Sequence, residues 1–481
     1  RIQGAEVVVC SKSSPGRGSC SAISQGQFRA SLHSFSAEDH KRLTLEAGKG
    51  LNHEGKLDVL VNNAARDVCR LQSFGVRLQE RAKGYDSNPE KIGSEGLCLT
   101  KPLTEQARSL GVRFRAPFFA SRIALDGGRA VGVWGLEPEN KEPAFIGAGC
   151  VILATGGAGA LYSRTDNPQG MTGDGYALAF EAGVPLMDME FVQFYPLCLA
   201  GSSRTSRLLP PLLGEVGRLE NALGEDVVAK YGIRSAPVAI AARDELCQAM
   251  AKEVEEGRGL PEGGLGLRIS REDALWRKAA DTFGLESVQA LRYWTEERLG
   301  DKEILPVMPA AHFCMGGVVA DERCATGIDG LFAAGEVVGG LHGANRYGGN
   351  ALTETAVFGR IAAEEALRAA RDLPAPDSSG LDKPHPATGD ASGREKRVCS
   401  DLRRRLQDLM WRHAGIIRSQ DSLRRAMEGL EALREELQAQ GEAYRSSISA
   451  LELGNMLRAA EMIVRSALAR EESRGSHYRS D

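Results

Sequence analysis

The sequence predicts an α/β protein whose C-terminal region is helical. Two short apolar runs, "AEVVVC" at residues 5–10 and "CVILA" at residues 150–154, are each followed by a loop of glycine and small polar residues. Such apolar runs are typical of buried parallel strands. Ligands of open α/β sheets bind at the loops where these strands end, and small polar residues suit such loops. From residue 397 to residue 471, leucine, methionine and alanine recur three and four positions apart, which predicts a bundle of amphipathic helices.

The composition is that of an ordinary globular protein and narrows the function classes. Of the 481 residues, 42% are hydrophobic and 26% are charged, and the net charge is −4. This mild acidity gives no reason to expect nucleic acid or an anionic membrane surface as a partner. No apolar run approaches the roughly 20 residues needed to span a bilayer, so we expect no direct membrane insertion. The ten cysteines form no C-x-x-C pair, which argues against a metal or iron–sulfur site in this chain and favours a cytoplasmic protein with reduced thiols.

The chain begins close to the first of the two apolar runs. A dinucleotide-binding domain normally opens one strand earlier, with a G-x-G-x-x-G turn that holds a pyrophosphate at a helix N-terminus. No such turn precedes "AEVVVC", and the preceding "RIQG" resembles the end of that helix. The sheet either begins near residue 5 or continues into a phosphate loop upstream of Arg1, and we expect the second, an N-terminally truncated chain.

Turn and cap residues predict several elements between these strands. Ser36, followed by acidic residues, marks the start of a helix. Asp126, Gly127 and Gly128 divide two alternating runs and predict a β-hairpin. Asp174 stands at the entrance of a further helix, where it serves either as the N-cap or as a cofactor contact.

A change in the sequence pattern predicts an inserted domain. Between about residues 197 and 305, helical and loop-like segments replace the pattern of strands and glycine turns, which then returns. A stretch rich in proline, glycine, serine and aspartate later separates one clear helix from the C-terminal helices. We therefore predict five segments: the first part of an α/β domain (1–196), a capping domain (197–305), the second part of the α/β domain (306–371), a linker (372–396) and a helical domain (397–481).

Eight segments, taken in order, resemble one family. They are "SKSSPGRGS", "ATGGAGALY", "TGDGYALAFEAGVPLMDMEFVQFYP", "ARDELCQAM", "PVMPAAHFCMGG", "GIDGLFAAGE", "HGANRYGGNAL" and "ESRGSHYRSD". Together they are similar to the flavoprotein subunits of succinate dehydrogenase and fumarate reductase, with L-aspartate oxidase as a close relative. The resemblance covers almost the whole chain. It implies a Rossmann-like FAD-binding domain, interrupted by an α+β capping domain and followed by a C-terminal helical domain.

The resemblance implies four residues that handle the substrate. Arg346 matches the family's substrate arginine, and its planar fork can bind a carboxylate through two hydrogen bonds. His312 matches a second substrate-holding group, although a core histidine is the plainer interpretation of that residue taken alone. Arg243 matches the arginine that carries the catalytic proton; without the resemblance it would be taken for a surface arginine paired with an acid. Tyr195 stands where the family has a substrate-binding histidine.

The resemblance also implies FAD, bound non-covalently. Cys20 stands where respiratory members carry the histidine that bonds covalently to FAD. A helix beginning near Asn350 would direct its N-terminus at the flavin ring and stabilise negative charge on the reduced flavin. The residues that match cofactor contacts are Ser11, Lys12, Ser19, Ser21, Gln25, Gly26, Thr155, Gly156, Asp174, Glu336, Ala351 and Leu352.

From these matches we expect an FAD-dependent oxidoreductase that transfers hydride between flavin N5 and a C=C or CH–CH bond next to a carboxylate. A covalent link raises the flavin potential in that family, so its absence favours the reductive direction. The family's usual Thr-Glu-Gly-x-Arg-Gly-Glu-Gly run is largely replaced here by "LLPPLLGE" at residues 208–215. These apolar residues suggest a substrate that is larger or less polar than succinate.

Two alternatives remain at this point. One is an amino-acid oxidase resembling L-aspartate oxidase, which the loop "GGNAL" at residues 348–352 disfavours. The other is a truncated, flavin-poor relative that mainly binds partner subunits. An iron–sulfur subunit is expected as a partner by family analogy alone, and any contact with a membrane would pass through partner subunits.

Overall fold

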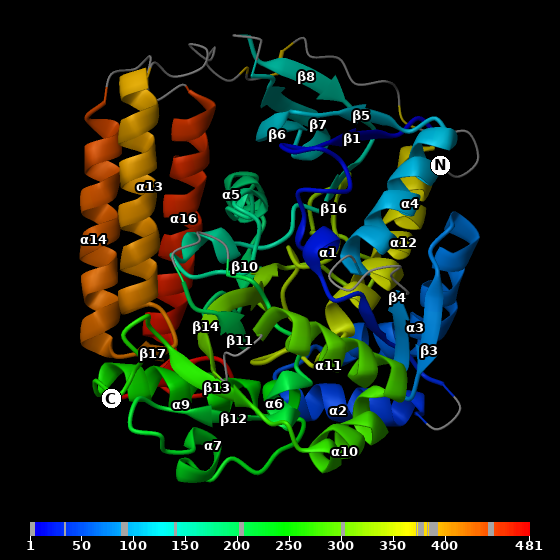
Figure 1. Ribbon diagram of the computed structural model, residues 1–481. Helices are drawn as coiled ribbons and strands as arrows, with labels where there is room; N and C mark the ends of the chain where they lie inside the picture. The colour runs from blue at the N-terminus through cyan, green and yellow to red at the C-terminus, as the bar shows by residue number, and fades with distance from the viewer. Residues whose placement is uncertain are drawn as a thin grey trace.

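The computed structural model describes residues 5–32, 35–87, 95–138, 142–201, 206–299, 304–371, 393–440 and 447–481, with the single positions 373, 380, 381 and 383. The "RIQG" segment and most of the linker expected at 372–396 therefore lie outside the described residues. The chain forms an α/β region, a capping region and a C-terminal helical bundle, as Figure 1 shows. No helix within the described ranges is long and apolar enough to cross a membrane.

The α/β region is built around parallel strands and the helices beside them. Its principal elements are β1 (Val8–Cys10), β5 (Arg113–Arg115), β9 (Val151–Leu153), β16 (Leu331–Ala333), α2 (Ala37–Ala47), α3 (Glu54–Arg70), α4 (Glu95–Ser109), α5 (Asp174–Glu181) and α12 (Asn350–Ala370). β1 pairs in parallel with β5, and β9 with β16, so both predicted parallel strands are confirmed. They are less buried than predicted, since Val9 is 38% exposed and Ile152 is 39% exposed. Ser36 caps α2 as expected, its hydroxyl accepting a hydrogen bond from the N–H of Asp39.

Two three-stranded antiparallel sheets, one antiparallel pair of short strands and several short helices complete this region. These elements are β2 (Gln27–Arg29), β3 (Leu78–Arg81), β4 (Gly84–Ser87), β6 (Phe119–Asp126), β7 (Arg129–Leu136), β8 (Ala144–Gly147), β10 (Leu186–Met187), β15 (Gly317–Val318), α1 (Cys20–Ile23), η1 (Leu71–Phe74) and η2 (Gly159–Leu161). β6 and β7 form the predicted hairpin. Gly127 and Gly128 have φ angles of 55° and 83°, the left-handed conformation that a two-residue hairpin turn requires.

The capping region contains more strand than its sequence suggested. Its elements are β11 (Val192–Leu199), β12 (Gly217–Glu220), β13 (Leu265–Ile269), β14 (Ile304–Cys314), α6 (Leu213–Val216), α7 (Val227–Lys230), α8 (Val238–Ala241), α9 (Arg243–Glu255), α10 (Asp273–Phe283) and α11 (Leu285–Leu299). Four strands form one antiparallel sheet in the order β11-β14-β13-β12. This sheet runs across the boundaries expected at 196/197 and 305/306. β11 and β14 therefore extend from the capping region into the α/β region, and the hydrogen bonds of one sheet hold the residues where the two regions meet.

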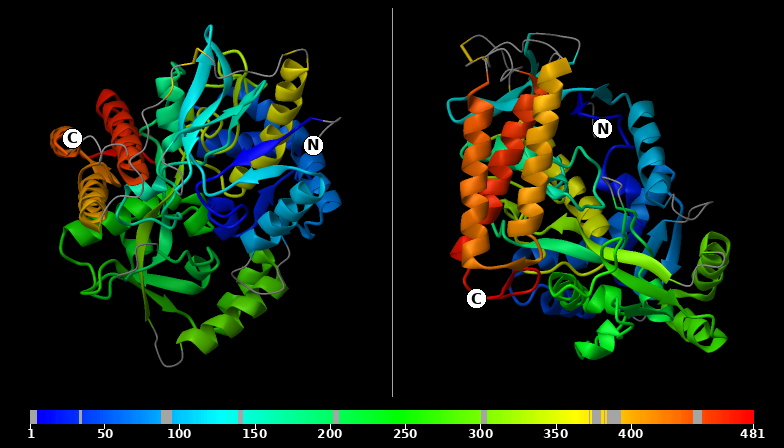
Figure 2. Two further views of the ribbon diagram at one scale, coloured as in Figure 1. Left: turned by 90° about the horizontal axis from the view of Figure 1, so that it is seen from above. Right: turned by 60° about the vertical axis from the view of Figure 1, so that its left-hand side comes forward.

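The C-terminal region is the predicted helical bundle. Its elements are α13 (Gly393–His413), α14 (Gln420–Gln438), α16 (Ile448–Ala469) and the short parallel strands β17 (Ile417–Arg418) and β18 (Tyr478–Arg479). Figures 1 and 2 show the three long helices side by side along one flank of the molecule. The residues predicted to form their apolar faces are buried: Leu402, Leu406, Met410, Leu453, Met456, Leu457, Ala460, Ile463, Val464 and Ala467. α16 also packs against α5, which joins the bundle to the α/β region.

Candidate active site

A cavity of about 950 Å³ lies where the α/β and capping regions meet. Its volume is at the upper end of the range for ligand sites, about 300–1,000 Å³. Most of the site residues expected from the sequence line it: Ser19, Ser21, Gln25, Gly26, Thr155, Gly156, Tyr195, Arg243, His312, Glu336, Arg346, Ala351 and Leu352. These residues come from segments far apart in the chain, so the fold brings them together.

Arg243 is the first residue of α9 and is buried, with 5% of its surface exposed. Its Nη1 donates to Gln193 Oε1 (2.7 Å), and its guanidinium lies 5.2 Å from the centre of the Tyr195 ring. Among the described residues it forms no ion pair, so the surface arginine paired with an acid is excluded. Burial lowers the pKa of Arg243 below its ordinary value.

Arg346 lies in the loop before α12 and is also buried, at 7% exposure. Its Nη2 is 3.0 Å from His312 Nε2, and its guanidinium stacks 4.8 Å above the Phe313 ring. Within the described part of the chain, its Nε has no hydrogen-bond partner and no carboxylate forms an ion pair with it. Burial, reinforced by the charge of Arg243, lowers the pKa of Arg346 to about 9, so the guanidinium stays charged at neutral pH.

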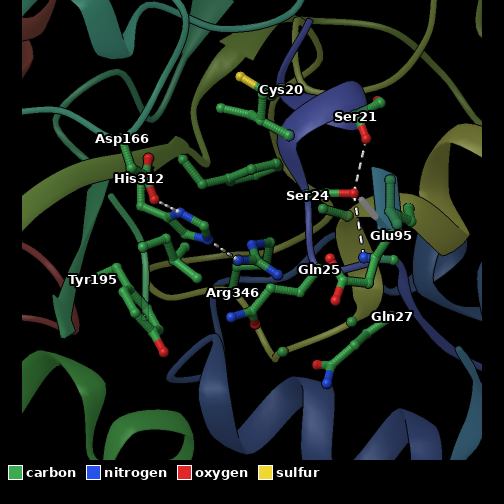
Figure 3. A pocket seen from close by; sticks show the side chains of 18 of the residues that line it. Cys20, Ser21, Ser24, Gln25, Gln27, Glu95, Asp166, Tyr195, His312 and Arg346 are labelled. Atoms are coloured by element: carbon green, nitrogen blue, oxygen red, sulfur yellow. Dashed lines mark hydrogen bonds and ion pairs between the residues drawn. The ribbon is translucent and has the colours of Figure 1, made fainter. Parts of the chain in front are cut away.

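His312, on β14, connects Arg346 to a buried carboxylate. Its Nδ1 is 2.7 Å from Asp166 Oδ2, and Figure 3 shows Asp166, His312 and Arg346 in a line across the cavity. Asn167 holds this arrangement, because its Nδ2 donates to Asp166 Oδ1 (2.8 Å) and to the His312 carbonyl (2.9 Å). A carboxylate only accepts hydrogen bonds, so His312 carries a proton on Nδ1. Nε2 then accepts a hydrogen bond from Arg346 Nη2, so both ring nitrogens are engaged, as in a satisfied histidine, but His312 also lines the cavity.

The pKa of His312 is set by opposing influences. Burial lowers it, Asp166 raises it, and the charges of Arg346 and Arg243 lower it again. A substrate carboxylate beside Nε2 would offset the two arginines and favour the protonated form, which can donate a hydrogen bond from Nε2. Asp166 is thus a positioning residue that supports this protonation. Arg243, His312 and Arg346 are called the Arg–His cluster below.

Replacing Asp166 with asparagine should therefore shift the pH profile rather than only reduce activity. The change removes the charge that favours protonated His312, so the pKa of His312 falls. The limb of the kcat/KM profile on which His312 loses its proton should move to lower pH. Steady-state profiles measure this shift, with Asp401→Asn, an exposed carboxylate on α13, as the control. An unchanged profile with reduced kcat would contradict the assigned role.

Gln193 was missed in the sequence and links the two arginines. It is 1% exposed on β11. Its Oε1 accepts from Arg243, while its Nε2 donates to Asn345 Oδ1 (2.6 Å) and to the Arg346 carbonyl (3.0 Å). The sequence feature that could have indicated Gln193 is its position as the single amide among the apolar residues of "EFVQFYP". Asp166 and Asn167, in "TDNP", carried a similar signal.

Tyr195 lies in the site, but its hydroxyl is engaged elsewhere than expected. The hydroxyl donates to the Leu209 carbonyl at 2.8 Å. The ring lies under Arg243 and 5.5 Å from the His312 ring. Tyr195 therefore holds two members of the Arg–His cluster by ring contacts and is occupied as a hydrogen-bond donor.

Ser11, Lys12 and Asp174 do not line the cavity. Lys12 Nζ is 2.5 Å from Asp174 Oδ2 and 2.6 Å from Glu452 Oε1, on α16. Asp174 is the first residue of α5 after Gly173, which is the N-cap, so the N-cap interpretation of Asp174 is wrong. These ion pairs connect the loop after β1 to the helical bundle. Cofactor contacts by the three residues stay a prediction.

A second part of the cavity is lined by two glycines and by the first turn of α12. Gly26 and Gly349 line it with φ angles of 68° and 87°. Neighbouring side chains also require glycine at both positions, because a Cβ on Gly26 would lie 1.9 Å from Ser87 Oγ and one on Gly349 would lie 2.8 Å from Arg29 Cγ. Gly349 is the N-cap of α12 and provides no side-chain hydrogen bond, so the positive end of this long helix faces the cavity uncapped. These features fit the flavin of FAD.

Known proteins match the chain over nearly its whole length. Residues 1–352 match the family described as FAD binding domain, and residues 403–481 match the one described as fumarate reductase flavoprotein C-term. One subunit of the fumarate reductase (CoM/CoB) of Methanothermobacter marburgensis is 33% identical over 98% of this chain and 89% of its own length. This chain belongs to the succinate dehydrogenase/fumarate reductase flavoprotein family.

Further relatives of this flavoprotein are named for two different activities. L-aspartate oxidase 1 of Ralstonia nicotianae is 33% identical over 99% of this chain and 91% of its own length. Among solved structures, a mutant of E. coli quinol fumarate reductase FrdA superposes with a TM-score of 0.81 at 26% identity, covering 100% of this chain and 87% of that chain. This chain is therefore an FAD-dependent oxidoreductase with the predicted α/β fold and C-terminal helical domain.

Proposed function

We propose that this flavoprotein reduces a C=C bond next to a carboxylate. The observation that carries the proposal is the pair of buried arginines, Arg243 and Arg346, neither of which forms an ion pair among the described residues. Two buried cations without a counter-ion are unfavourable unless an anion joins them. His312 adds a third group whose protonation an anion favours. A substrate carboxylate completes this site.

Bound FAD supplies the hydride for the reduction or accepts it in the reverse direction. In the proposal, Ser19, Ser21, Gln25, Gly26 and the first turn of α12 hold the cofactor. Arg346 and His312 bind the carboxylate and fix its plane, and orientation of this kind can supply several kcal/mol of the barrier. Arg243 delivers the proton to the neighbouring carbon. Its burial lowers its pKa and so favours proton release, and Gln193 holds its guanidinium in place.

The cofactor is proposed to be non-covalent and the direction reductive. Cys20 is the first residue of α1 and lines the cavity, in the place of the family's covalent histidine. Burial, together with nearby acidic groups, raises the pKa of the Cys20 thiol, so it remains protonated and a poor nucleophile. An iron–sulfur protein is the proposed electron source by family analogy, and the name of the M. marburgensis relative, a subunit, supports assembly with other chains. The complex would be cytoplasmic, or peripheral to a membrane through its partners.

The first experiment is the visible spectrum of the purified, desalted chain before and after acid precipitation. Flavin that leaves with the acid supernatant, together with fumarate-dependent oxidation of reduced methyl viologen, is the expected result. Flavin retained in the pellet would overturn the non-covalent assignment. Release of ammonia and hydrogen peroxide from L-aspartate, without fumarate reduction, would favour the second candidate, the amino-acid oxidase suggested by the R. nicotianae relative. Absence of flavin would favour a partner-binding role.

A further inference from the structure

One side of the cavity is formed by an apolar wall, residues 208–212, "LLPPL". The whole segment lines the cavity, and Leu209 and Leu212 are only 1% and 3% exposed. The wall is joined directly to the Arg–His cluster. Tyr195 donates its hydroxyl hydrogen to the Leu209 carbonyl (2.8 Å), while its ring lies under Arg243. A small acid held by the cluster would therefore have this wall beside it.

The apolar wall offers few hydrogen-bond donors. The N–H of Leu209 donates to the Leu197 carbonyl (2.8 Å), and Pro210 and Pro211 have no N–H. A carboxylate pressed against these residues would lose its hydration without gaining donors, which is strongly unfavourable. A hydrocarbon group in the same place gains free energy by leaving water. The Arg–His cluster thus favours a carboxylate at one end of a ligand, and the apolar wall favours a hydrocarbon group at the other end.

Helices of the capping region extend this apolar surface. Ile240 on α8, Phe283 on α10 and Leu291 on α11 also line the cavity. Arg207, which precedes the wall in the chain, lines the cavity as well and is exposed, so it is a charged group that could bind a second carboxylate. An exposed arginine in water binds a carboxylate far more weakly than a buried one. The apolar surface therefore outweighs Arg207 in selecting the distal group.

We propose that the substrate is an α,β-unsaturated monocarboxylate with a hydrocarbon group on its β-carbon, rather than a dicarboxylate. The proposal, which rests on the proposed function, sets the carboxylate at Arg346 and His312 and the hydrocarbon group against the apolar wall. Reduction adds a hydride to the β-carbon, which the bound carboxylate makes electron-poor, and a proton from Arg243 to the α-carbon. The two electrons come from reduced FAD, and two equivalents of reduced methyl viologen restore them in an assay.

The test compares acids of similar size with and without the second carboxylate. Fumarate and trans-2-hexenoate are the oxidants of reduced methyl viologen with the flavin-loaded protein, and succinate and hexanoate are the ligands in calorimetric titrations. We expect kcat/KM for trans-2-hexenoate to exceed that for fumarate at least about tenfold, and hexanoate to bind at least about tenfold more tightly than succinate. Leu209→Thr should lower both ratios. Leu213→Thr is the matched control, because Leu213 is fully buried and does not line the cavity.

Arg207→Gln separates the remaining outcomes. A preference of the wild type for fumarate and succinate that disappears in Arg207→Gln would overturn the inference and identify Arg207 as the anchor of a second carboxylate. The same preference persisting in Arg207→Gln would overturn it too. Turnover of neither acid by the flavin-loaded protein would count against the proposed function instead. The ratio of hexanoate to succinate binding would then decide the inference alone.

Discussion

Replacing Arg243 with lysine should lower kcat by about 10²–10⁴-fold, the contribution typical of a positioned acid or base. Lysine keeps the positive charge but loses the planar group that stacks on Tyr195 and donates to Gln193. The dissociation constant of the acid should change far less than kcat, since Arg346 and His312 still bind the carboxylate. Rapid mixing of pre-reduced protein with fumarate or trans-2-hexenoate, followed by flavin absorbance, measures both quantities.

Arg218→Lys is the matched control for this variant. Arg218 lies on β12 in the same capping region, but it is exposed and does not line the cavity. The control should retain wild-type kcat and flavin content. A loss of less than about tenfold in Arg243→Lys would contradict the need for a planar guanidinium in proton delivery.

Replacing Arg346 with glutamine should weaken carboxylate binding by about 2–5 kcal/mol, or about 30–5,000-fold in the dissociation constant. The change removes both the charge and the fork that can bind a carboxylate through two hydrogen bonds. Arg346→Lys should fall between the wild type and the glutamine variant, because a lysine keeps only the charge. Titration with a saturated acid, succinate or hexanoate, measures the effect without turnover. Equal affinity in the wild type and Arg346→Gln would refute the assigned anchor.

The affinity of the wild type should also depend on pH in a way that identifies Arg346. Burial lowers the pKa of Arg346 to about 9, so its charged form, which binds carboxylate, is lost as the pH rises through that value. Binding should therefore weaken above about pH 9 in the wild type. Arg346→Gln has no such charge to lose, and the corresponding limb should be absent from its titrations.

Local patterns in the sequence predicted several of the elements. The strand that ends at Cys10, the hairpin at Gly127 and Gly128, and the apolar faces of the C-terminal helices all formed as predicted. Periodicity and turn chemistry depend on residues close together in the chain, so they can be recognised without the tertiary structure. β12 and β13 were missed because each is short and is stabilised by pairing with distant strands.

The principal candidate site residues were also predictable, for a different reason. Arg243, His312 and Arg346 stand in motifs whose resemblance to a known family picked them out, and the cavity brings all three together. Composition or spacing alone would have left Arg243 on the surface. The resemblance could identify these residues, but it did not reveal what holds them.

By itself, the sequence predicted the family, several of the elements and the candidate site residues of this flavoprotein. Only the tertiary structure decided which polar groups support them. Asp166 meets His312 across 146 positions of the chain, and Gln193 meets Arg243 across 50. The tertiary structure also paired Lys12 with both Asp174 and Glu452, and neither Lys12 nor Asp174 lines the cavity. Hydrogen bonds and ion pairs between such distant residues depend on how the strands and helices pack, which no local pattern encodes.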